Sequence, residues 1–103
     1  MLKNVSIIDS NTTILTATAN TAVTTMIFCN TDTVDHTVTV YAIQSGGSAN
    51  TASTIISELS IPAKDSYIWS ANEKFLLGTN DFIVAVSNYA TTGISCTITY
   101  IEY

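Results

Sequence analysis

The sequence contains no arginine, three lysines, one proline and four glycines among its 103 residues. Charged residues make up 11% of the chain, against about 25% in typical soluble domains. Eight acidic residues outnumber the lysines, so the formal net charge is -5. An acidic chain without arginine does not supply the dense cationic contacts that bind nucleic-acid phosphates, and an anionic membrane surface repels it. We therefore expect neither nucleic acid nor a membrane among its partners.

Long apolar runs are also missing. No stretch approaches 18 consecutive apolar residues, so the sequence predicts no membrane-spanning helix. The first residues hold one lysine and then a short stretch interrupted by polar residues, unlike the apolar core of a secretory signal. We expect synthesis in a cytoplasm. The only cysteines, Cys29 and Cys96, lie in apolar runs outside any CxxC pair. Two buried, reduced thiols are the favoured interpretation, and one disulfide is the alternative.

The residues that are present are mainly those of a packed β-protein. Hydrophobic residues make up 47% of the chain and the mean hydropathy is +0.35. Such a composition excludes intrinsic disorder, and the length fits a single domain over residues 1–103. The same composition leaves few charges to cover the surface of a monomer. We therefore expect additional burial between chains.

Alternation of apolar and polar residues runs through the whole sequence, and no stretch shows helical periodicity. Threonine, serine, isoleucine and valine dominate, as is typical of strands. We expect strands over residues 4–8, 12–18, 21–30, 36–44, 54–61, 66–70, 82–89 and 94–103. Turn residues separate them about every 10 residues, which predicts an all-β fold: a single antiparallel β-sandwich or jelly roll of about eight short strands. The glycine- and serine-rich segment 45–52 predicts a mobile surface loop.

Signals for chemistry are weak. His36 is the only histidine, and its neighbour Asp35 would point to the opposite face of a strand, so the two do not form a dyad by adjacency. No GxSxG motif is present, and the cysteines and carboxylates lack the spacing of a zinc site. Turn chemistry explains Asp32 and Asp35 better than calcium binding does. We expect no enzyme, no metal and no cofactor.

Aromatic residues offer the clearest candidates for contacts with a partner. Tyrosine and tryptophan are typical anchors of protein interfaces, and they also form platforms that bind sugars. We favour core or interface roles over carbohydrate binding. The candidate interface residues are Tyr41, Ile43, Tyr67, Trp69, Tyr89 and Tyr103.

Several turn motifs resemble a known group. They are CNTD at residues 29–32, LSIPAKDS at residues 59–66 and LGTNDFI at residues 77–83. Together with the order of the strands, they resemble the small β-sandwich virion proteins of tailed bacteriophages. These motifs mark turns and core positions, and the resemblance transfers no catalytic residue.

The resemblance implies a virion accessory protein, and such proteins are often trimeric. The expected function is that of a capsid decoration or cement protein, located in the virion and made in the host cytoplasm. It would bind itself, as a homotrimer, and other virion subunits such as the major capsid protein. The alternative is a tail, baseplate or fibre component with host-glycan binding.

Overall fold

The structure, a computed structural model, describes residues 1–88 and 93–103 apart from the side chains of residues 70–74. Within these residues the chain forms eight strands and one short 3-10 turn, η1 (Thr51–Ser53). The strands are β1 (Leu2–Ile7), β2 (Thr12–Thr16), β3 (Thr21–Asn30), β4 (His36–Ile43), β5 (Thr54–Ile61), β6 (Ser66–Leu77), β7 (Phe82–Ser87) and β8 (Ile94–Glu102). The expected all-β fold of about eight strands is confirmed.

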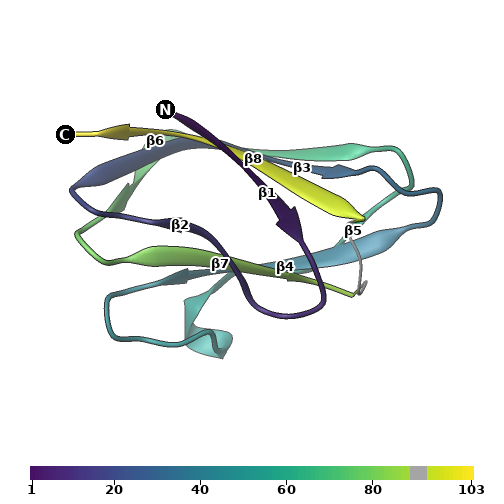
Figure 1. The fold of residues 1–103 in the computed structure, drawn as a ribbon, viewed down its shortest axis with the longest axis horizontal. Coiled ribbons are helices and arrows are strands. Elements are labelled where there is room, and N and C mark those ends of the chain that lie inside the picture. The colour runs from purple at the N-terminus through teal and green to yellow at the C-terminus, as the bar shows by residue number, and fades with distance from the viewer. Residues whose placement is uncertain (89–92) are drawn as a thin grey trace.

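The strands form two four-stranded antiparallel sheets that pack face to face (Figure 1). Sheet A has the order β1-β8-β3-β6 and sheet B the order β2-β7-β4-β5. The strands pair in a nested order, in which the first strand pairs with the last and each inner pair lies within the previous one along the sequence: β1/β8, β2/β7, β3/β6 and β4/β5. This nesting is the strand order of a jelly roll, one of the two sandwich types that the sequence predicted.

The core lies between the sheets and follows the alternation of the strands. On β3, Met26 and Phe28 point inward and are fully buried, whereas Ile27 and Cys29 point outward and are half-buried. The run 26–29 is apolar on both faces, which predicts that both faces are covered. The single chain covers only one of them, because Ile27 and Cys29 lie on the outer face of sheet A.

Two motifs singled out in the sequence meet at one corner of the sandwich, around Asn30. This side chain is fully buried at the end of β3. Its Nδ2 donates to the carbonyl oxygens of Val34 and Ile61, each at 2.9 Å, and its Oδ1 accepts from the backbone N–H of Asp32. Asn30 therefore joins the turn after β3 to the end of β5.

A second corner depends on Asp81, in the turn between β6 and β7. Its two carboxylate oxygens accept from the backbone N–H groups of Ser45 and Gly78, each at 2.8 Å. The backbone of Asp81 also accepts from Ala17. The side chain of Asp81 thus connects the end of β4 to the end of β6. Its backbone carbonyl connects the same turn to Ala17, which directly follows β2.

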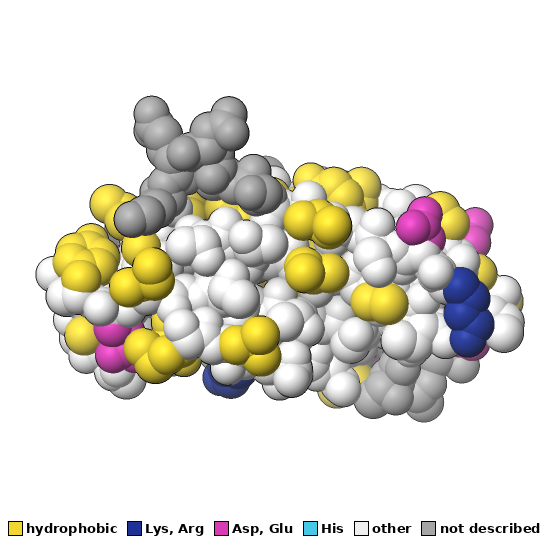
Figure 2. All heavy atoms as spheres, turned by 90° about the horizontal axis from the view of Figure 1, so that it is seen from above, with side chains coloured by type: hydrophobic (Ala, Val, Ile, Leu, Met, Phe, Trp, Pro, Cys, Tyr) yellow, Lys and Arg dark blue, Asp and Glu magenta, His cyan; other side chains and the backbone are white. Residues whose placement is uncertain are grey.

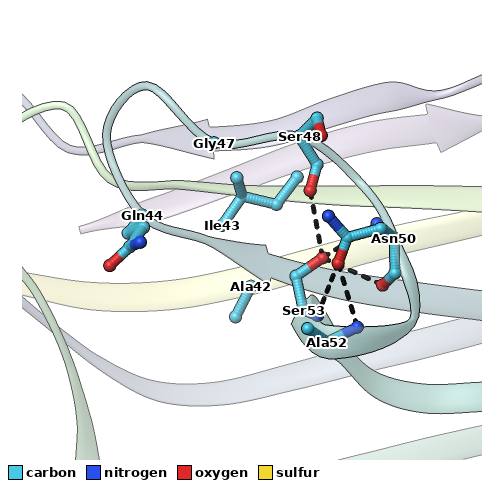
Figure 3. A pocket seen from close by; sticks show the side chains of 8 residues that line it. All are labelled: Ala42, Ile43, Gln44, Gly47, Ser48, Asn50, Ala52 and Ser53. Carbon is cyan, nitrogen blue, oxygen red and sulfur yellow. Dashed lines mark hydrogen bonds between the residues drawn. The ribbon is translucent and has the colours of Figure 1, made fainter.

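The segment that follows β4 forms an exposed loop, as expected. It arches beside Ile43, and Asn50 caps η1 by accepting from the N–H groups of Ala52 and Ser53 (Figure 3). A Cβ atom on Gly47 would lie 3.1 Å from the Ile43 side chain, so the loop runs close to that residue. Its mobility stays a prediction.

Candidate interaction surface

The outer face of sheet A lacks charged side chains at its described outward positions. Pairing and burial identify these positions, because residues directly opposite one another in a sheet share a face. They are Leu2, Asn4 and Ser6 on β1, Ser95, Thr97, Thr99 and Ile101 on β8, Ala22, Thr25, Ile27 and Cys29 on β3, and Ser66, Ile68 and Leu76 on β6. Every one of them is a hydroxyl, amide, thiol or hydrocarbon side chain.

Large apolar side chains stand out from this face. Ile68 is 62% exposed, Leu76 60% and Leu2 62%, although each belongs to a regular strand. Leu76, Ile101, Ala22 and the C-terminal Tyr103 line a shallow depression of about 320 Å³ at one end of the sheet. Figure 2 shows this face: hydrophobic and uncharged side chains fill its middle, and charged side chains lie toward its ends and edges.

The dimensions of the face suit a protein interface. Four strands at about 4.8 Å and some eight residues at about 3.3 Å give a flat footprint of roughly 500 Å². The accessible surface of such a face exceeds its footprint, so it approaches the ~800 Å² that each partner buries in a standard interface. Exposed aliphatic side chains gathered on a face of this size, among described outward positions that carry no charge, are typical of a docking surface.

The structure distributes the six candidate interface residues over different surroundings. Tyr67 and Trp69 point inward from β6, opposite Phe28 and Met26, and pack against the margin of the core. Trp69 also makes an edge-to-face contact with Phe75 at 5.7 Å between ring centroids. These two aromatic residues are therefore core neighbours and do not form a surface platform.

The remaining described candidates lie on both sheets, two on the outer face of sheet B and one at the end of sheet A. Tyr41 is half-buried on the outer face of sheet B. Ile43 lies on the same outer face and is only 3% exposed, because the loop after β4 lies beside it. Tyr103 is 67% exposed at the apolar end of sheet A, and Tyr89 lies outside the described residues.

Sequence reasoning missed Ile68, Leu76 and Ile101 as surface residues. The signal was present in the alternation of β6 and β8, where Ile68 and Leu76 follow Tyr67 and Phe75, and Ile101 follows Tyr100. Aromatic residues on one face of a strand and aliphatic residues on the other are both compatible with a core, and only the paired strands show which face is inward.

The two cysteines lie on opposite faces of sheet A, and both are free. Cys96 is fully buried, and this burial raises the pKa of its thiol to about 12. Cys29 is half-buried on the outer face, so the expectation that both thiols are buried is right for Cys96 and wrong for Cys29. Neighbouring strand residues alternate between faces, and Cys29 follows the inward Phe28.

His36 is buried and contacts Asp32 instead of its sequence neighbour. Its Nε2 lies 2.9 Å from Asp32 Oδ2, whereas Asp35 accepts from the backbone N–H of Ala63. The hydrogen bond from His36, followed by that from the Thr33 backbone, lowers the pKa of Asp32. In the described part of the chain, no three His, Cys, Asp or Glu side chains gather as a metal site. The contact between Asp32 and His36 therefore stabilises the turn between β3 and β4.

Among the described residues, no helix has the length and apolar character needed to cross a membrane. No family model and no curated protein matches the chain. It is similar to one chain in the structure of infectious bursal disease virus Gx strain, with a TM-score of 0.41 and 12% sequence identity. The similarity covers 99% of this chain and 33% of that one, so this chain spans about a third of the similar chain.

Proposed function

We propose that the chain is a structural protein of a tailed-bacteriophage virion, a capsid decoration protein that binds other virion subunits through packed strand faces. The observation that carries this proposal is the exposure of Ile68, Leu76 and Ile101 on the outer face of sheet A, whose described outward positions carry no charge. In a monomer these apolar side chains stay exposed to water. Association buries them and is therefore favoured by the hydrophobic effect. The turn motifs that resemble phage virion proteins support the same proposal.

The proposed function involves non-covalent association and no covalent step. Copies of the chain associate, as a homotrimer, and the assembly adds buried area across junctions between capsid subunits. A protein that binds only the assembled shell stabilises that shell by mass action. The acidic, arginine-free composition suits the outside of a particle, because packaged nucleic acid repels negative charge.

Counting copies of the chain in purified particles tests this function. We expect quantitative mass spectrometry to find hundreds of copies per virion, and immunogold labelling to mark the heads. Absence of the chain from purified particles would overturn the virion assignment. A few to a few dozen copies, with label on the tails, would favour a tail, baseplate or fibre component over capsid decoration.

A further inference from the structure

An open groove lies on the outer face of sheet B, on the side of the sandwich opposite the outer face of sheet A, which is the docking face of the proposed function. It has a volume of about 620 Å³ and runs over β4 and β5 beside η1. Tyr41 and Val86 give it apolar contact area. Its remaining lining residues, which include Thr39, Asn50, Ser57 and Glu58, all carry hydroxyl, amide or carboxylate groups.

A β-bulge directs Glu58 toward this groove. Val38 pairs with Leu59 and Val40 pairs with Ile56, so Ser57 and Glu58 together oppose the single residue Thr39. Glu58 has a φ of 44°, a left-handed conformation that non-glycine residues adopt at a cost. Its backbone N–H donates to Thr39 Oγ1 at 3.0 Å, which holds the bulge in place. Bulges commonly redirect a side chain in this way.

Two polar side-chain groups of the groove remain available for a ligand, whereas Thr39 Oγ1 and Asn50 Oδ1 already accept hydrogen bonds from the backbone. Within the described residues, neither the Glu58 carboxylate nor the Tyr41 hydroxyl takes part in a hydrogen bond. An ionised carboxylate only accepts hydrogen bonds, so it selects a ligand with several donors. A tyrosine ring adds an apolar surface with a polar edge. No lysine lines the groove, and Glu58 makes it unfavourable for an anion.

We propose that this groove binds a neutral saccharide. The hydroxyl groups of the sugar donate to the Glu58 carboxylate, and the C–H face of the ring packs on Tyr41. The hydroxyl and amide groups around them satisfy the remaining polar atoms of the sugar. This inference goes beyond the proposed function and is independent of it, because the groove and the docking face belong to opposite sheets. In an assembly held through sheet A, the groove faces outward.

A glycan array tests the inference on the full chain. The probes are neutral hexose oligosaccharides and their sialylated and sulfated counterparts, and the protein is displayed as a streptavidin tetramer so that weak sites gain avidity. We expect binding to neutral glycans and weaker binding to the acidic counterparts. Tyr41→Ala and Glu58→Gln should each reduce the binding at least about tenfold, as expected when a charge-assisted hydrogen bond or a ring contact is lost.

Two matched variants serve as controls. Tyr103→Ala and Glu102→Gln remove the same groups from exposed positions near the C-terminus, and thermal unfolding confirms that all four variants fold. Both controls should bind as the wild type does. The inference is overturned if no neutral glycan binds, if only acidic glycans bind, or if the controls lose binding to the same extent. Ile68→Glu, which places a charge on the outer face of sheet A, should leave glycan binding unchanged. Glycan binding is therefore expected even if the chain does not associate through sheet A.

Discussion

Single polar side chains inside the sandwich determine how its turns connect. Asn30 makes three hydrogen bonds at a fully buried position, and two of its acceptors are backbone carbonyl oxygens on either side of the corner. An unpaired buried carbonyl costs free energy comparable to a lost hydrogen bond. The CNTD motif therefore marks a structural residue and not a reactive one.

Replacing Asn30 should be strongly destabilising. We expect Asn30→Ala to lower the free energy of unfolding by about 2–4 kcal/mol, because three hydrogen bonds are lost and the buried carbonyl oxygen of Ile61 loses its side-chain donor. Urea denaturation measures the change. Asn20→Ala, at an exposed position, is the control and should stay within about 0.5 kcal/mol of the wild type. Equal effects of the two substitutions would contradict the role assigned to Asn30.

The Asp32–His36 pair should make stability depend on pH in the acid range. Because the folded state lowers the pKa of Asp32 from its usual value of 3.8, its contribution is present above 3.8 and is lost as the pH falls through the folded value. The stability difference between the wild type and Asp32→Asn should therefore shrink as the pH decreases below 4. Urea denaturation at several pH values measures it, and a difference that stays constant would refute this account.

The two thiols should differ in reactivity. In native protein dilute enough to be dissociated, we expect a thiol reagent at about pH 8 to modify Cys29 alone, because Cys96 is buried with a pKa of about 12. Denatured protein should show two reactive thiols, and Cys29→Ser should abolish the native reaction. Rapid modification of Cys96 in the folded chain would show that the core around it is open.

At the scale of elements, the sequence predicts the strands well because each has a clear period of two and ends at turn residues. The predicted range 21–30 coincides with β3, and 54–61 coincides with β5. The main departure is β6, which continues to Leu77 and includes the apolar residues 75–77 that appeared separate in the sequence. Their pairing with residues 21–23 extends the strand, and such long-range pairing leaves no local signal.

The Glu58 bulge and the burial of Ile43 were less predictable, because they also depend on contacts between distant parts of the sequence. The bulge at Glu58 depends on the register between β4 and β5, and the loop beside Ile43 depends on hydrogen bonds across the chain. The alternation along β4 places Ile43 on its outer face, but it does not show that a loop lies against that part of the face. Contacts between distant segments decide exposure, and alternation within one strand does not report them.

The connection made by Asp81 gives a prediction for the turn elements. Asp81→Ala removes both hydrogen bonds that hold the β6–β7 turn and the end of β4, and we expect a loss of about 1–3 kcal/mol in unfolding free energy. The matched control is Asp9→Ala, at an exposed turn position. Limited proteolysis supplies a second measurement, since the loop after β4 should be cleaved faster in Asp81→Ala than in the control. Unchanged cleavage and stability would contradict the connecting role.

At the scale of the whole molecule, the sandwich has two chemically different outer faces. The described outward positions of sheet A carry no charge and include exposed aliphatic side chains, whereas sheet B presents a polar groove with a carboxylate and a tyrosine. The proposed packing between copies through sheet A would leave a smaller surface for the few charges of the chain to cover. Because few ion pairs can contribute, salt should have little effect on this packing.

Light scattering after size exclusion, at low micromolar concentration and at both low and high salt, tests the central claim that sheet A is an association surface. The account predicts a species of about 33 kDa, three chains of 11.0 kDa each, in both salts. Ile68→Glu should dissociate it to monomers, whereas Val34→Glu, which places the same charge at an exposed turn residue away from sheet A, should not. A wild-type species of 11 kDa in both salts, or an oligomer that Ile68→Glu leaves intact, would contradict the claim.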